Sequence, residues 1–325
     1  MKRRQFITLL GGAAAAWPLA TRAQQPAMPV VGYLYSGVPE LSEGLVAAFR
    51  KGLSEAGFME GRNVAVEYRF AYNDDARLAE LAADLIRRRV AVIAAPGGPR
   101  AAAAAKGLTT TIPIVFSTGN DPVQAGLVAS LNRPGANVTG ITSMNVDLGT
   151  KRLGLLHELL PKAERFAALV SRSQDASSIA DLQTAASAIG RQIEFVAATT
   201  NSEIDSAFGT LVQKQVDALL VTPFALFDNR RVQLVSLAAY HRLPTMYSFR
   251  EHVEAGGLMS FGSSSADRDR QVGVYAGRIL KGEKPADLPV IRATKFELVI
   301  NLQTARLLGI EVPPGLLAIA DEVIE

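Results

Sequence analysis

The segment PVVGYLY, residues 29–35, is followed by apolar residues spaced four apart, and these two patterns together decide the fold class. The unbroken apolar run predicts a strand that is buried on both faces. The spaced residues are Leu41, Leu45, Phe49 and Leu53. Their period predicts an amphipathic helix directly after the strand. A buried strand followed by a helix is the repeating unit of a parallel sheet covered by helices on both sides.

The same alternation continues through the chain and restarts after Thr139. Apolar runs predict further strands at residues 64–68, 90–95, 112–117, 166–171, 193–197, 218–222 and 244–247. Amphipathic patterns predict helices between the strands, in the first half at residues 78–88, 101–106 and 123–131. We therefore expect an α/β fold made of two doubly wound, Rossmann-like lobes in succession.

The C-terminal part of the sequence predicts that the chain crosses between the lobes more than once. Its patterns indicate a helix at residues 266–280, a strand at 296–300 and a last helix from residue 304. We expect the first lobe to hold residues 28–142 and about 263–288, and the second to hold residues 143–262 and about 289–325. No low-complexity linker separates the halves, so short hinges are expected to let one lobe rock against the other.

Residues 1–23 have the pattern of an export signal. A basic start with Arg3 and Arg4 is followed by a short apolar run, and small residues lead to a cleavage site after Ala23. The sequence RRQFI resembles a twin-arginine signal, and an ordinary Sec signal is the alternative. Because no cysteine follows the apolar run, no lipid anchor is expected. We expect the mature protein in the periplasm and not embedded in the membrane.

Composition argues against several classes of protein. The leader holds four of the 34 basic residues, which leaves 30 basic and 31 acidic residues in the rest of the chain. A nucleic-acid-binding domain would concentrate positive charge in the fold, so none is expected. The chain has no cysteine, and His157, His241 and His252 lack metal-ligand spacing. We therefore expect no disulfide, no metal and no cofactor.

Polar segments directly after the expected strands are the first candidates for a binding site, because ligands of open parallel sheets bind beyond the carboxyl ends of the strands. These segments are residues 35–37, 96–98, 118–121, 143–144, 171–172, 223–224 and 248–250. They are rich in hydroxyl, amide, glycine and aromatic groups and poor in acid–base pairs, which favours binding over catalysis. Each segment can also be read as a simple turn.

Two turns allow a more specific interpretation. Residues 95–98, with Arg100 beyond them, predict a tight strand-to-helix turn whose backbone N–H groups can hold a ligand carboxylate. A phosphate cradle is the alternative for residues 95–98. Asp121 and Pro122 have the pattern of a helix cap, with a ligand clamp as the alternative role of Asp121. Neither a G-x-S-x-G elbow nor an H-E-x-x-H helix occurs in the sequence, so no hydrolase is indicated.

Five motifs, in order along the chain, resemble the ABC-transporter substrate-binding family that includes tryptophan- and tyrosine-binding members. They are NDPVQAGLV at residues 120–128, LNRPGANVTG at 131–140, AGGLMSFG at 255–262, ILKGEKPADLP at 279–289 and NLQTARLLG at 301–309. The resemblance covers residues 29–315 and implies the type I periplasmic-binding fold with a three-stranded hinge. It also implies a small-molecule ligand trapped by lobe closure, a partner ABC permease with its ATPase, and no catalysis. We expect a monomer.

The resemblance implies ligand-binding residues by position. In this sequence they are Tyr35, Ser36, Pro96, Gly97, Thr118, Asn120, Ser143, Ser171, Phe224 and Ser248. Two features depart from the amino-acid-binding members: residues 36–39 read SGVP where a His-Pro element is frequent, and Phe224 lies in a loop that often carries an acid. A buried ammonium without a counter-charge is costly. An aromatic or carboxylated compound, stacked on Tyr35 or Phe224, is therefore an alternative to an amino acid.

Two other classes of function share much of this pattern. A periplasmic sensor would use the same clamp to present its ligand state to a receptor. A secreted α/β enzyme would need a nucleophile or an acid–base pair in the cleft. A transcriptional regulator of this fold is disfavoured, because an export signal stands where a DNA-binding helix-turn-helix would begin.

Overall fold

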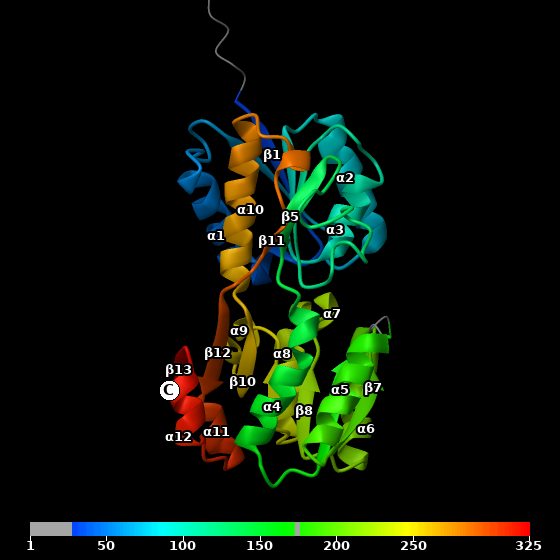
Figure 1. The fold of residues 1–325 in the computed structure, drawn as a ribbon, viewed down its shortest axis with the longest axis vertical. Coiled ribbons are helices and arrows are strands. Elements are labelled where there is room, and N and C mark those ends of the chain that lie inside the picture. Colours follow the sequence, from blue (N-terminus) through cyan, green and yellow to red (C-terminus); the bar gives the residue numbers. More distant parts are fainter. Residues whose placement is uncertain (1–27, 173–175) are drawn as a thin grey trace, which may run out of the picture.

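The computed structural model describes residues 28–172 and 176–325, so the expected export signal lies outside the described residues. Two sheets, each covered by helices on both faces, lie one above the other along the long axis of the molecule (Figure 1). Within the described ranges, no helix is both long enough and apolar enough to cross a bilayer.

The first sheet has six strands in the order β11-β5-β4-β3-β1-β2, and every pair is parallel. Its strands are β1 (Val30–Tyr35), β2 (Ala65–Phe70), β3 (Val92–Ala95), β4 (Ile114–Thr118), β5 (Val138–Thr142) and β11 (Ile291–Arg292). Its helices are α1 (Glu43–Glu55), α2 (Asp75–Arg87), α3 (Pro99–Lys106) and α10 (Ser265–Leu280). Helices α1 and α10 cover one face, and α2 and α3 cover the other (Figure 1).

Alternating side chains of the strands build one hydrophobic core on each face of this sheet. On β1, Val31 and Tyr33 pack with α1 and α10, whereas Leu34 packs with α2 and α3. Helices α1 and α10 approach very closely: a Cβ on Gly273 would lie 2.1 Å from the Phe49 carbonyl oxygen. Only glycine fits there, so this crossing is fixed by the sequence.

The second sheet has seven strands in the order β13-β12-β10-β9-β8-β6-β7. They are β6 (Arg165–Val170), β7 (Gln192–Ala197), β8 (Ala218–Val221), β9 (Thr245–Tyr247), β10 (Met259–Ser263), β12 (Phe296–Asn301) and β13 (Glu322–Ile324). The helices of this lobe are α4 (Gly149–Leu159), α5 (Ala176–Ala188), α6 (Asn201–Gln213), α7 (Ala225–Asn229), α8 (Arg231–Tyr240), α9 (Arg250–Glu254), α11 (Leu302–Leu308) and α12 (Pro314–Ile319). All pairs are parallel except β10 with β12, which is antiparallel.

The chain passes between the two sheets three times: after β5, between β10 and α10, and between β11 and β12. The first two passages are tied together, because Oδ1 of Asn145 accepts a hydrogen bond of 3.1 Å from the Ser263 N–H. Helix α10 follows the second passage and packs on the first sheet, although most residues of the second sheet precede it in the chain (Figure 1).

The expected fold class, two doubly wound α/β lobes, is confirmed by these two mostly parallel sheets. The helix expected at residues 123–131 is wrong, because the chain forms turns there. Gly126 has a φ of +67°, a left-handed conformation that ends the turn after Pro122. Asp121 nevertheless behaves as expected of a cap, since its Oδ1 accepts the Val123 N–H at 2.7 Å.

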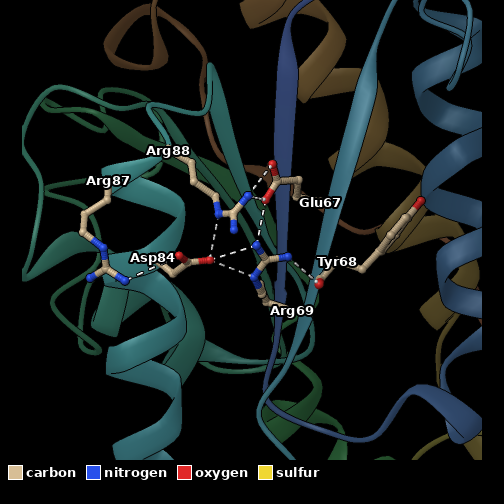
Figure 2. Close-up of polar contacts among 6 residues, drawn as sticks. All are labelled: Glu67, Tyr68, Arg69, Asp84, Arg87 and Arg88. Atoms are coloured by element: carbon tan, nitrogen blue, oxygen red, sulfur yellow. Dashed lines mark hydrogen bonds and ion pairs between the residues drawn. The ribbon is translucent and has the colours of Figure 1, made fainter.

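The outer edge of the first sheet carries a network of charged side chains between β2 and α2 (Figure 2). Nη2 of Arg69 lies 2.7 Å from Oε2 of Glu67 and 2.8 Å from Oδ2 of Asp84, and Nε of Arg88 lies 3.1 Å from the same Asp84 oxygen. The hydrogen bonds from Arg69, more than those from Arg88, lower the pKa of Asp84. The network attaches α2 to the edge strand, which is where a sheet is most open to unwanted pairing.

Candidate ligand-binding site

A cavity of about 330 Å³ lies between the two lobes, at the carboxyl ends of the strands. The first lobe contributes the end of β1, Leu41 and Leu45 around the start of α1, the start of α3, the loop after β4 and the N-terminal part of α10. The second lobe contributes the loops after β6, β8 and β9, together with α7, α8 and α9. A volume of this size suits a small organic molecule.

Five of the ten residues implied by the resemblance line this cavity, and five do not. The lining residues are Tyr35, Gly97, Asn120, Ser171 and Phe224. The residues outside the lining are Ser36, Pro96, Thr118, Ser143 and Ser248. Several of these have hydroxyl groups bonded within the protein. Oγ1 of Thr118 accepts the Asn120 N–H at 3.1 Å, and the Ser248 hydroxyl donates to the Val221 carbonyl at 3.0 Å.

Aromatic rings from both lobes form the apolar part of the cavity. Tyr35 comes from β1, Phe224 precedes α7 and Phe249 precedes α9. The Tyr35 ring lies directly over the backbone of Gly97, where a Cβ would be 2.2 Å from the ring. Gly97 also has a φ of +82°, so the expected tight turn needs glycine for both its conformation and its contact with the ring.

Three carboxyl groups line the cavity, and none of them was predicted from the sequence as a ligand-binding group. Asp228 and Glu251 belong to α7 and α9 of the second lobe, and Asp269 belongs to α10 of the first. Burial, and then repulsion from Glu251, raises the pKa of Asp228 to about 7. Burial also raises the pKa of Glu251. Three arginines, Arg100, Arg231 and Arg268, also line the cavity, so it holds ionisable groups of both signs, contrary to the expectation of few.

Asp269 faces the cavity with one oxygen held and one available. Oδ1 accepts a hydrogen bond of 3.2 Å from the Ser117 hydroxyl, and buried Oδ2 has no hydrogen-bond partner among the described residues. Burial raises the pKa of this carboxyl to about 7, against the opposing charge of Arg268. The buried Tyr33 hydroxyl also interacts with this carboxyl, so a ligand donor would join Ser117 and Tyr33 at Asp269.

Arg268 is the arginine whose charge acts most strongly on Asp228 and Asp269. Its guanidinium lies 5.0 Å from the centre of the Phe249 ring, and Nη2 donates to the Ser265 hydroxyl at 3.0 Å. The buried Nε of Arg268 lacks a hydrogen-bond partner in the part of the chain that the structure describes. A site with free carboxylate oxygens and a free guanidinium N–H suits a ligand that carries charges of both signs.

His252 also lines the cavity, although its sequence context gave no reason to expect a ligand-binding role. Its ring stacks on Tyr247 at 4.7 Å. Burial lowers the pKa of His252 to about 4, so the imidazole is uncharged at neutral pH. It therefore adds no positive charge beside the three carboxyl groups.

The family model described as ABC transporter substrate binding protein matches residues 41–324. The chain belongs to this family. The resemblance inferred from the sequence motifs is thereby confirmed. This substrate-binding protein is also 29% identical over 266 residues to a protein named Tyrosine-binding protein from Clostridioides difficile (strain R20291). That alignment covers 81% of this chain and 76% of the relative.

Solved structures of similar proteins share the two-lobed fold. A domain from Streptococcus pneumonia in complex with L-Trp is 28% identical and superposes with a TM-score of 0.82. The ligand-free, open structure of a substrate-binding protein with adhesive properties from Clostridium difficile is 26% identical and gives a TM-score of 0.67. Each covers 91% of this chain and 99% of the other. The fold of this substrate-binding protein is that of the type I periplasmic binding proteins.

Proposed function

We propose that this chain is the periplasmic solute-binding component of an ABC importer and that its ligand is an aromatic amino acid. The observation that carries the proposal is the convergence of Asp228, Glu251 and Asp269 on a cavity with aromatic walls. An acidic group in the loop of Phe224 was missing from the sequence pattern. Asp228 provides one, because it lies one helical turn after Phe224.

The distribution of the acids over two lobes gives a physical reason for closure. Asp269 is on the first lobe, and Asp228 and Glu251 are on the second. Burial, and for Asp228 also repulsion from Glu251, raises the pKa values of these carboxyl groups in spite of the charge of Arg268, so ionising them in the closed cavity is unfavourable. A ligand ammonium between them removes that cost in the closed arrangement alone. A ligand shifts an equilibrium only through such differential contacts.

The remaining groups of the ligand have complementary surfaces in the same cavity. A ligand carboxylate pairs with Arg268, whose Nε is available. An aromatic side chain packs against Tyr35, Phe224 and Phe249. The names of two similar proteins, one tyrosine-binding and one in complex with L-Trp, support the same ligand class.

Calorimetric titration of residues 24–325 tests the ligand class. We expect L-tryptophan or L-tyrosine to bind. The matched analogues that lack the amine are indole-3-propionate and 3-(4-hydroxyphenyl)propionate. They should bind at least about 100-fold more weakly, because without the ligand ammonium the buried carboxylates stay unpaired. Tryptamine, which lacks only the carboxylate, tests the role of Arg268. Equal affinity for L-tryptophan and indole-3-propionate would contradict the ammonium site.

Export and transport form the second part of the proposal. The twin-arginine-like signal at residues 1–23 supports export to the periplasm and cleavage after Ala23. We propose that the mature monomer delivers its ligand to an ABC permease and its ATPase. Cell fractionation should recover a periplasmic protein that begins at Gln24. If the export route is twin-arginine, the double substitution Arg3→Lys with Arg4→Lys should block export. An uncleaved cytoplasmic protein would contradict this part.

A further inference from the structure

Two polar contacts join the lobes at the rim of the cavity, away from the three passages of the chain. Nδ2 of Asn229, at the end of α7, donates a hydrogen bond to Oδ1 of Asn73, which lies between β2 and α2. Nη2 of Arg231, in α8, donates to the Leu41 carbonyl oxygen at 3.1 Å. In both contacts the donor is on the second lobe and the acceptor is on the first.

The backbone around Asn73 is shaped to present its side chain. Tyr72 and Asn73 have φ values of +54° and +67°, a left-handed conformation that asparagine tolerates better than most residues. The turn is held by hydrogen bonds from the Asn73 N–H to the Ser36 carbonyl at 2.7 Å and from the Tyr72 N–H to the Gly37 carbonyl at 3.1 Å. Both acceptors directly follow β1, so the turn is rigidly attached to the first sheet.

The approach of the two lobes is close at this point. A Cβ on Gly37 would lie 2.5 Å from Oδ1 of Asn229, so the first lobe meets the Asn229 side chain directly. Asn229 and Arg231 line the cavity, whereas Asn73 does not. Asn73 can therefore influence a ligand only through its contact with the other lobe.

We propose that Asn73, Asn229, Arg231 and the Leu41 carbonyl form a closure latch, a set of contacts that stabilises the closed clamp and slows ligand release. Asn73 is a positioning residue in this latch. The proposal rests on the proposed function, because closure has to coincide with ligand binding. The latch contacts form only when both lobes meet at the rim, so they stabilise the closed state and not the open one. Loss of these contacts should therefore raise mainly the dissociation rate of the ligand.

The assay uses a property of the sequence. The one tryptophan of the chain, Trp17, lies in the leader, so residues 24–325 contain none. Bound L-tryptophan can therefore be followed by its own fluorescence in stopped-flow displacement. Asn73→Gly removes the side-chain amide and keeps a residue that adopts positive φ without strain. Asn132→Gly, at an exposed position outside the cavity lining, is the control for removal of an asparagine side chain elsewhere.

We expect Asn73→Gly to raise the dissociation rate about 3- to 10-fold, as for loss of one hydrogen bond, with little change in the association rate. The melting temperature of the ligand-free Asn73→Gly protein should not fall, because glycine tolerates the positive φ at this position and the latch acts on lobe closure and not on either core. An unchanged dissociation rate in Asn73→Gly, or an equal rise in the control, would overturn the latch.

A second measurement separates the latch from the identity of the ligand. The chain has no cysteine, so Asn73→Cys with Asn229→Cys gives a unique thiol pair. A short bismaleimide should cross-link this pair, and faster in the presence of L-tryptophan. If the pair is cross-linked while the unaltered protein binds no amino acid, only the proposed ligand class fails. If no cross-link forms with or without ligand, the closure latch is wrong.

Discussion

Replacing Asp228 by asparagine separates the role of this carboxyl in ligand binding from its effect on folding. Asp228→Asn keeps the size of the side chain and one oxygen acceptor but removes the negative charge. According to the proposed function, the charge holds the ligand ammonium and is costly when no ligand is present. The variant should therefore bind the ligand more weakly and be more stable in the ligand-free state.

The loss of affinity can be sized from the geometry of a buried pair. Two unit charges 4 Å apart interact by about 4 kcal/mol at an effective dielectric constant of 20. Removing one partner of a buried, hydrogen-bonded charge pair costs about 2–5 kcal/mol in measured interfaces. Because asparagine still accepts a hydrogen bond, we expect a loss of about 2–4 kcal/mol. This corresponds to a rise in the dissociation constant of about 30- to 1,000-fold.

The gain in stability follows from the pKa of the same carboxyl. Burial raises the pKa of Asp228 from 3.8 to about 7. At pH 8 the carboxyl is ionised in both the folded and the unfolded state, and the folded protein carries the cost of that buried charge. Because one pKa unit corresponds to about 1.4 kcal/mol, the rise of the Asp228 pKa from 3.8 to about 7 limits the cost of its buried charge to at most about 4 kcal/mol. The neutral asparagine removes it, so the ligand-free melting temperature should rise.

Fluorescence titration with L-tryptophan and thermal unfolding at pH 8 measure the two effects. Asp287→Asn is the control, because Asp287 is exposed and outside the cavity lining. The reasoning would be refuted if Asp228→Asn bound L-tryptophan as tightly as the unaltered protein. It would also be refuted if affinity and ligand-free stability fell together, since that result indicates a structural role for the carboxylate.

Three further predictions concern pH and packing. Because Asp228 and Asp269 have raised pKa values of about 7, protons compete with the ligand ammonium for these carboxylates below that pH. Calorimetry should show that the dissociation constant rises between pH 7 and pH 5, by about tenfold per pH unit for each proton displaced. A dissociation constant that does not change with pH would contradict the ammonium site. Gly273→Ala should lower the free energy of unfolding by about 1–3 kcal/mol in urea, since its Cβ would meet the Phe49 carbonyl, and an unchanged midpoint would show that α1 and α10 can separate freely. Asp84→Asn should lower the free energy of unfolding at pH 7, because it removes the charge that pairs with Arg69 and Arg88. At a pH well below the lowered pKa of Asp84 the carboxyl is protonated in the unaltered protein too, so urea titration should find the two proteins equally stable. The same loss of stability at both pH values would exclude the charge as the cause.

Nine strands could be predicted from the sequence because most of them are short apolar runs, whereas β5, β10, β11 and β13 were not predicted. The helix expected at residues 123–131 shows the limit of this reasoning. The apolar spacing there is helical, and Asp121 acts as a cap, but Gly126 adopts a left-handed conformation and the chain turns away. The pattern of apolar residues does not report which of two accessible conformations a glycine takes.

Part of the cavity lining could be predicted from the positions at or just beyond the ends of the strands. Tyr35, Gly97 and Phe224 are examples, because the topology alone brings strand ends to one edge. The charged residues were missed for a different reason. Asp228 lies a helical turn beyond the strand-end segment, and Asp269 comes from α10, which joins the first sheet after the chain has built most of the second. Whether a helical acid faces solvent or a cavity depends on packing that local sequence does not encode.

A crystal structure of residues 24–325 with L-tryptophan or L-tyrosine, whichever binds more tightly, tests the central claim most directly. We predict a closed clamp with the ligand ammonium within hydrogen-bond distance of both Asp228 and Asp269, and with the ligand ring against Tyr35 and Phe224. A ligand bound outside the cavity between the lobes, or an amine turned away from these two carboxylates, would contradict the account.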